Sequence, residues 1–227
     1  KGGADMKKIE MSNQIKIAYQ DVGTGIPVIL IHGLDGNLAG FYSLKKELKK
    51  HYRVIVYDVR GHGKSTHPTS YNLNDHIKDL TMLMQQLGIK SAHLLGHDMG
   101  GVIAQEFTNQ HPDKVEKLVL VSSISNQGKQ PLIKLIAKHR DKVAGFSKEE
   151  AMLILFNEIF HDVKSTFKWY QEVKKYYRMT PEEDAISVRS INGINIKIDH
   201  IDIPTLIVKG KHDPFDIDND SENIKNA

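Results

Sequence analysis

The segment Gly96–Gly101 (Gly-His-Asp-Met-Gly-Gly) has the composition of a sharp turn that presents one reactive side chain. It lies between an apolar run at 92–95 and a segment of helical periodicity from about Gly100, the strand–turn–helix context of a nucleophile elbow. Glycines two residues before and two residues after Asp98 permit close approach of the backbone and raise the carboxylate above the sheet. The amide of Met99, at the positive end of the following helix, can donate to a developing oxyanion. Asp98 is therefore a candidate nucleophile.

A second candidate motif, His32–Gly36 (His-Gly-Leu-Asp-Gly), follows another strand. Val28–Ile31 is a continuous apolar, largely β-branched run, as expected of a strand buried on both faces. The backbone amide of Leu34, just past this strand, is the candidate second donor to an oxyanion at Asp98. The sequence therefore predicts an oxyanion hole made by the amides of Leu34 and Met99.

The elements that position these motifs alternate between strand and helix. After a hairpin at 9–19, the pattern predicts strands at 28–31, 53–57, 92–95 and 117–121, and helices at 41–50, 74–87 and 100–109. Such alternation with short links predicts an α/β protein with a mostly parallel, doubly wound sheet covered on both faces. From about 130 to 189 only helices are expected, at 132–138, 148–160, 166–177 and 181–192. Because the strand pattern resumes at Pro204–Val208, this helical stretch is predicted to be an insertion that forms a lid.

In this order the motifs resemble those of the α/β-hydrolase family. The resemblance covers His32-Gly33, the segment Asp58–Ser65 (Asp-Val-Arg-Gly-His-Gly-Lys-Ser), the elbow Gly96–Gly101, and the strand and turn Ile203–Asp213. It implies the fold of that family, with core parts at 6–124 and 196–227 and a helical cap inserted at 125–195; residues 1–5 are interpreted as a vector remnant. The resemblance also places Asp213 where the family has the acid that orients the catalytic histidine.

The residue at the nucleophile position changes the chemistry that the resemblance implies. Most of the family has serine there, whereas Asp98 is similar to the epoxide hydrolase and dehalogenase branches. A carboxylate that attacks an ester carbonyl makes a reactive anhydride, but one that attacks an alkyl carbon makes a stable alkyl ester. A water activated by histidine then hydrolyses that ester at the carbonyl of Asp98, with the oxyanion held by the Leu34 and Met99 amides. Asp98 therefore predicts a cofactor-independent and metal-independent hydrolase of a small apolar substrate.

Other residues agree less well with those branches. Met99 stands where dehalogenases typically have a halide-binding tryptophan, and Asp35 stands where epoxide hydrolases usually have a proline. The motifs at 32–36 and 96–101 look more like those of serine esterases and enol-lactonases. Two alternatives therefore stay open. One is a carboxylic ester or lactone hydrolase whose active form has serine in place of Asp98, and the other is a non-catalytic binding protein on the same fold.

The family's catalytic histidine is expected beyond Asp213, and no histidine follows that residue in the sequence. His97 lies inside the elbow, His200 in the approach to the last strand, and His212 on the same turn as the acid. None of these three is expected to be the base, so we expect the base to lie outside this chain. Without it, an alkyl ester on Asp98 would accumulate.

Apolar side chains are candidates to line a substrate pocket between sheet and cap: Phe41, Leu153, Phe156 and Trp169. Core packing is the more ordinary explanation for each of them. A small-molecule substrate is the expected partner, and self-association is left open.

Composition narrows the classes of protein further. The 227 residues include 31 Lys+Arg against 28 Asp+Glu, a formal charge of +3 that is too balanced to indicate nucleic acid or an anionic membrane as the main partner. Cysteine is absent, which excludes disulfides, thiolate nucleophiles and Cys-based zinc sites. The longest apolar run, Ala151–Phe156, is far shorter than the roughly 20 residues of a membrane span. Together these features predict a cytoplasmic protein of one globular domain.

Overall fold

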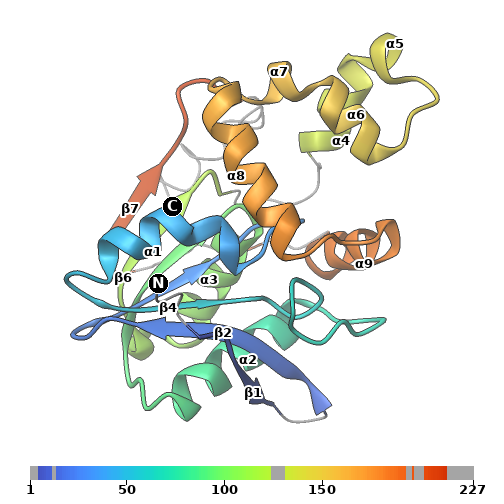
Figure 1. The fold of residues 1–227 in the computed structure, drawn as a ribbon. Coiled ribbons are helices and arrows are strands. Elements are labelled where there is room, and N and C mark those ends of the chain that lie inside the picture. Colours follow the sequence, from blue (N-terminus) through green and yellow to red (C-terminus); the bar gives the residue numbers. More distant parts are fainter. Residues whose placement is uncertain (1–4, 12–13, 124–130, 193–195, 197–201, 214–227) are drawn as a thin grey trace.

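The computed structural model describes residues 5–11, 14–123, 131–192, 196 and 202–213. Its strands form one sheet in the order β1-β2-β4-β3-β5-β6-β7 (Figure 1). Their bounds are β1 Lys7–Glu10, β2 Lys16–Val22, β3 Pro27–Ile31, β4 Arg53–Tyr57, β5 Ala92–His97, β6 Val115–Val121 and β7 Thr205–Val208. The pairs β1/β2 and β2/β4 are antiparallel, and the pairs from β4 to β7 are parallel. The predicted mostly parallel sheet is confirmed.

The two faces of the sheet explain why the central strands are apolar throughout. Successive side chains of a strand point to opposite faces. Ile29 and Ile55 pack into a large cluster with side chains of α2 (Leu73–Gln86) and α3 (Met99–Gln110). Leu30 packs into a second cluster on the other face, with side chains of α1 (Tyr42–Leu48). A strand with helices on both faces has no polar side, so the uninterrupted apolar runs are required.

The ends of α2 follow from its sequence. Asn72 accepts a hydrogen bond from the amide of Asp75, and the Asp75 side chain accepts one from the amide of Asn72, which forms a capping box. After the helix, Gly88 takes a φ of 65°, the left-handed conformation in which many helices end. The predicted helix at 74–87 is thus present with its boundary shifted by one residue.

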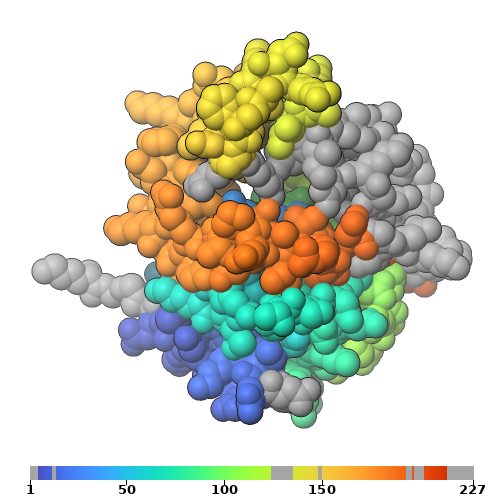
Figure 2. Space-filling view, turned by 90° about the vertical axis from the view of Figure 1, so that its right-hand side faces the viewer, coloured from blue at the N-terminus to red at the C-terminus, as the bar shows by residue number. Residues whose placement is uncertain are grey.

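All described elements between β6 and β7 are helices: α4 Pro131–Lys138, α5 Arg140–Val143, α6 Lys148–Ile154, α7 Phe156–Ile159, α8 Val163–Tyr176 and α9 Pro181–Ile191. The single helix predicted at 148–160 is two helices, because the chain leaves helical geometry at Leu155 (φ −89°, ψ 8°). In Figure 1, α8 and α9 lie nearest to the sheet and α4 to α7 lie beyond them. Figure 2 shows α9, in orange, lying against the cyan and teal segment that follows β4.

Candidate active site

Asp98 stands at the junction between β5 and α3 in a conformation that non-glycine residues rarely adopt. Its φ is 51° and its ψ is −117°. The Asp98 amide donates to the carbonyl of Val121 at 3.1 Å, and the Asp98 carbonyl accepts from the amide of Gly101 at 2.9 Å. These bonds to β6 and to the first turn of α3 hold a strained backbone in place, as expected at a nucleophile elbow.

The elbow glycines are explained by contacts that leave no room for a side chain. A Cβ at Gly96 would overlap the backbone of Gly100, and a Cβ at Gly100 would overlap the carbonyl of Ile31. A Cβ at Gly101 would overlap the Ser123 hydroxyl. The sharp turn therefore packs directly against β3 and the end of β6, which fixes where the Asp98 side chain emerges.

The structure brings Leu34 to Asp98. The Leu34 amide donates to Asp98 Oδ2 at 3.0 Å. Gly33 is needed for this approach, because a Cβ there would lie 2.8 Å from Asp98 Cβ. Met99 is buried and is the first residue of α3, so its amide lies at the positive end of that helix. One of the two predicted amides is thus bonded to the Asp98 carboxylate, and the oxyanion hole of Leu34 and Met99 stays a prediction.

His32 ties this loop to the loop that follows β4. Its Nε2 accepts a hydrogen bond from the Val59 amide at 3.0 Å, so Nδ1 carries the proton and donates to the Gly33 carbonyl at 2.8 Å. Burial lowers the pKa of His32 to about 3, with a further contribution from the neighbouring His62. His32 is therefore a neutral structural group that fixes the backbone just before Leu34.

Asp58 is a functional candidate that sequence reasoning placed in a motif without giving it a role. Its buried carboxylate accepts bonds from the amides of Leu38 and Lys64, both at 2.8 Å, and from the Tyr176 hydroxyl at 2.7 Å. Burial raises the pKa of Asp58 to about 6, although all three hydrogen bonds favour the ionised form. Asp58 thus joins the loop after β3, the loop after β4 and the end of α8. The signal in the sequence that could have indicated this role is a single acid directly after the apolar strand at 53–57.

Two of the helices between β6 and β7 contact this assembly. On α8, Trp169 Nε1 donates to the Gly40 carbonyl at 2.9 Å, and the Val173 carbonyl accepts from Asn37 Nδ2 at 3.0 Å. Trp169 therefore holds the loop after β3 against α8, in addition to its predicted place at the pocket.

On α9, Ser187 and His62 Nε2 are hydrogen-bonded at 2.9 Å, while His62 Nδ1 lies 3.1 Å from the Arg60 carbonyl. Burial lowers the pKa of His62 to about 4. His62 therefore joins α9 to the loop after β4 as a neutral group.

The other predicted pocket residues lie in separate environments. Phe41 packs against the sheet cluster that includes Leu30. Phe156 belongs to an aromatic group in the cap, with its ring centroid 6.1 Å from that of Tyr170. Leu153 is 50% exposed. Their contact with a substrate stays a prediction.

Asp213 lies on the turn after β7, where its amide donates to the Gly210 carbonyl at 3.1 Å. The order of the sheet places β7 next to β6 and β6 next to β5, so Asp213 and Asp98 both follow the carboxyl ends of parallel strands. The neighbouring His212 is exposed and stacks on His161 of the cap, with ring centroids 4.1 Å apart. The predicted role of Asp213 as the acid that orients the base stays a prediction.

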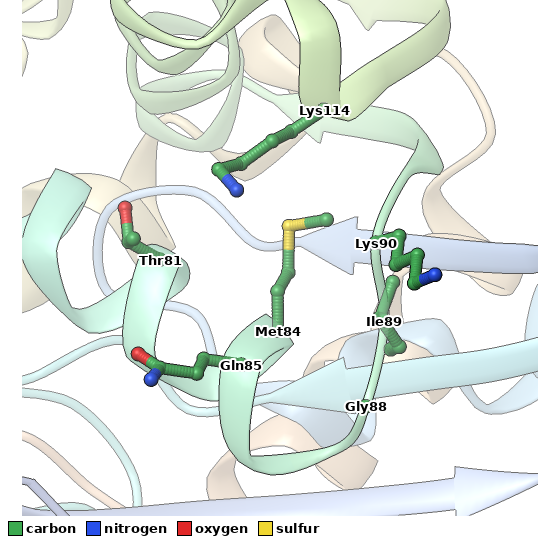
Figure 3. A pocket seen from close by; sticks show the side chains of 7 residues that line it. All are labelled: Thr81, Met84, Gln85, Gly88, Ile89, Lys90 and Lys114. Atoms are coloured by element: carbon green, nitrogen blue, oxygen red, sulfur yellow. The ribbon is translucent and has the colours of Figure 1, made fainter.

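A hollow of about 320 Å³ lies elsewhere, at the amino ends of β5 and β6 (Figure 3). It is lined by Thr81, Met84, Gln85, Gly88, Ile89, Lys90 and Lys114. Since Asp98 follows the carboxyl end of β5, this hollow is not part of the candidate active site. In the described part of the chain, no group of three or more His, Asp or Glu side chains is arranged to hold a metal ion. Nor does any described helix have the length and apolar character needed to cross a membrane.

The sheet is mostly parallel, a sharp turn after β5 presents Asp98, and an amide of the loop after β3 reaches that side chain. These features define the class of α/β proteins that carry a nucleophile elbow. A family model described as the alpha/beta hydrolase fold matches residues 26–227. The chain belongs to this family, and the resemblance seen in its sequence is confirmed.

Several known proteins similar to this chain are named as hydrolases. It is 34% identical over 122 residues to an sn-1-specific diacylglycerol lipase of Danio rerio, an alignment that covers 53% of this chain and 38% of the lipase. An esterase from Exiguobacterium antarcticum has a similar structure, with a TM-score of 0.77, 26% identity, and coverage of 96% of this chain and 85% of the esterase. The enol-lactonase from Burkholderia xenovorans LB400 shares the fold, with a TM-score of 0.77, 21% identity, and coverage of 93% and 84%. The matched part of this chain spans less than half of the curated lipase.

Proposed function

We propose that this protein is a hydrolase of small apolar epoxides or haloalkanes in which Asp98 is the nucleophile. The observation that carries the proposal is the 3.0 Å hydrogen bond from the Leu34 amide to Asp98 Oδ2. This bond holds one carboxylate oxygen and leaves Oδ1 to react. Family membership, the strained elbow and the similarity to named hydrolases support catalysis at this position.

The first step is a displacement at an alkyl carbon. An electron pair of Asp98 Oδ1 forms the bond to carbon while the carbon–halogen bond, or one carbon–oxygen bond of an epoxide, breaks and the leaving group takes its electron pair. The alkoxide formed from an epoxide takes up a proton from water. The product is an alkyl ester whose carbonyl oxygen is Oδ2, already hydrogen-bonded to the Leu34 amide.

The second step is hydrolysis of that ester. Water adds to Asp98 Cγ, the negative charge develops on Oδ2, and the Leu34 and Met99 amides stabilise it. When the intermediate collapses, the Cγ–Oδ1 bond breaks, and the alcohol leaves with Oδ1 and with the proton that the base took from the water. The water must lose a proton to a base, and we assign to Asp213 the role of orienting that base.

An ester or lactone hydrolase with serine at position 98 is the second candidate. The esterase and enol-lactonase structures favour it. Asp98 Oδ2 takes the Leu34 hydrogen bond that the carbonyl oxygen of an ester substrate would need. A serine side chain has no second oxygen, so it would leave that amide free for the substrate. The third candidate, a binding protein without catalysis, shares the fold but requires no reaction at Asp98.

Intact-mass measurement distinguishes the three. After incubation with styrene oxide or 1-bromohexane, we expect the mass to rise by one epoxide molecule or one hexyl group, and peptide mapping to locate the adduct on Asp98. Asp98→Asn should gain no adduct, and exposed Asp113 serves as the control for non-specific alkylation. An unmodified protein that also releases no diol or hexanol would refute the proposal.

The second candidate needs a separate variant. If Asp98→Ser hydrolyses p-nitrophenyl butyrate while the Asp98 protein neither reacts with nor turns over the alkyl probes, ester hydrolysis replaces our proposal. If neither protein reacts with any of these probes, the binding protein is favoured.

A further inference from the structure

We propose that Lys174 of the cap is a positioning residue for the Leu34 amide and that it acts through Asp35; this rests on the proposed function of the Leu34–Asp98 pair. Lys174 Nζ lies 3.0 Å from Asp35 Oδ1 and 2.8 Å from Asp35 Oδ2. The Lys174 side chain is only 10% exposed and that of Asp35 is 31% exposed. Partial burial weakens solvent screening, so this ion pair is stronger than a typical surface pair.

Asp35 occupies a backbone position that costs free energy. Residues Gly33–Gly36 form a tight turn closed by a hydrogen bond of 3.1 Å from the Gly36 amide to the Gly33 carbonyl. Leu34 and Asp35 are the two central residues, and Asp35 has a φ of 55°. A positive φ at the second central position is the feature of a type II turn, which favours glycine or asparagine there. The ion pair between Asp35 and Lys174 offsets this cost and keeps the turn closed.

The turn determines where the Leu34 amide points. Its first residue, Gly33, is fixed by the bond from His32 and by close packing on Asp98. Its second half depends on the conformation of Asp35, which has the positive φ. Loss of the ion pair would let this second half open, and the amide of Leu34 would move away from Asp98 Oδ2.

The ion pair is one of a row of contacts between α8 and this loop. Trp169 and Val173 contact the loop at Gly40 and Asn37, five and two residues beyond Asp35. Trp169 and Val173 are four residues apart and lie on one face of the helix, with Lys174 next to them. Figure 1 shows α8 passing beside the segment that leads into α1. Lys174 thus gives α8 a contact with the turn itself.

Charge gives Lys174 a second effect. Negative charge develops on Asp98 Oδ2 during hydrolysis, and Asp35 carries a negative charge one residue from the amide that stabilises it. Lys174 neutralises Asp35. Removing Lys174 alone would therefore leave a carboxylate that repels the developing oxyanion.

The test measures the Leu34 amide directly in the 227-residue protein, without substrate. We expect Lys174→Met to speed hydrogen exchange at the Leu34 amide by about tenfold, which corresponds to about 1.4 kcal/mol of lost local stability. Lys175→Met, next to it on the exposed side of α8, should change that exchange less than about twofold. Lys174→Arg should restore most of the protection, because it keeps the charge.

A double variant isolates the path through Asp35. Glycine adopts a positive φ without strain and has no charge, so Asp35→Gly should keep the Leu34 amide protected. In that background Lys174→Met should have no further effect on Leu34. The inference is wrong if Lys174→Met and Lys175→Met change hydrogen exchange at the Leu34 amide by the same factor. It is also wrong if Lys174→Met speeds this exchange equally in the Asp35→Gly background. A third contrary result is that Lys174→Met speeds exchange of the buried β5 amides as much as that of Leu34.

The consequence for chemistry is measured separately with the alkyl probes. Lys174→Met should lower the rate of alcohol release from the preformed Asp98 ester about tenfold or more, with little change in the probe concentration that gives half-maximal rate of ester formation. A change confined to the half-maximal concentration would place Lys174 in substrate binding and overturn its positioning role. If no probe reacts with Asp98, the proposed function fails, but the exchange measurements still decide whether Lys174 holds the turn.

Discussion

Tyr176→Phe removes one hydroxyl group that donates to the buried carboxylate of Asp58. The hydroxyl lies 2.7 Å from Asp58 Oδ2, and the phenylalanine ring would keep the packing and the contact of Lys64 Nζ, 4.3 Å from the ring centroid. Hydrogen bonds to charged groups contribute roughly 1.5–3 kcal/mol. Two backbone amides still satisfy Asp58 in the variant. We therefore expect the free energy of unfolding at pH 8 to fall by about 2 kcal/mol.

The pH dependence of this loss tests its cause. Burial raises the pKa of Asp58 from its ordinary 3.8 to about 6, so the folded state binds a proton more readily than the unfolded state between these values. The ionised Asp58 thus opposes folding above pH 6, and this cost disappears as the pH falls through that window. The Tyr176 bond reduces the cost by stabilising the ionised form. The effect of Tyr176→Phe should therefore be largest at pH 8 and less than half as large at pH 5.

Urea denaturation of each protein at the two pH values provides the measurement. Tyr177→Phe is the matched control, because the Tyr177 hydroxyl donates to Glu183 at 2.9 Å rather than to Asp58. An equal loss for Tyr176→Phe at pH 5 and pH 8 would refute the assignment to the Asp58 carboxylate. So would a loss at pH 8 no greater than that of the control.

Three further outcomes follow from the same structure. Burial lowers the pKa of His62 from 6.5 to about 4, so the unfolded chain binds more protons in this window and His62 alone should remove about 3 kcal/mol of stability as the pH falls through it. Asp58 acts in the opposite direction between pH 6 and 3.8, so the contribution of His62 is read from the flatter acid titration of His62→Gln. Gly100→Ala should cost more than about 3 kcal/mol in urea denaturation or prevent folding, whereas Gly88→Ala, which meets no atom within 4 Å, should cost only about 1 kcal/mol for its positive φ. Asn72→Ala should lower the free energy of unfolding by about 1 kcal/mol through loss of the α2 capping box. An unchanged value would show that this helix cap is dispensable.

Local patterns predicted the parts of the fold that local forces determine. The apolar run Val28–Ile31 predicted a strand because burial on both faces excludes polar side chains. The glycines of Gly96–Gly101 predicted an elbow because their spacing is a local steric requirement. The break at Leu155 was missed because apolar periodicity continues across it.

The network at Asp58 was missed for a different reason. Its partner Tyr176 is 118 residues away in the sequence, on a helix whose position depends on the whole cap. The tautomer of His32 likewise depends on the Val59 amide, 27 residues away. Residue types and spacing do not determine contacts of that kind, because they arise only when separately predicted elements pack together.

The helices between β6 and β7 fall into two groups by their packing. Helices α4 to α7 pack around a cluster of their own, which includes Leu135, Val143 and Leu155 and is distinct from the two clusters of the sheet. By contrast, α8 and α9 are joined to the loops of the candidate active site by directional hydrogen bonds. Substitutions in the first group should therefore leave the Leu34 amide in place. Substitutions on the inner face of α8 should change the reaction rate of every substrate by a similar factor. They move the Leu34 amide and the neighbouring loop, which act on every substrate in the same way.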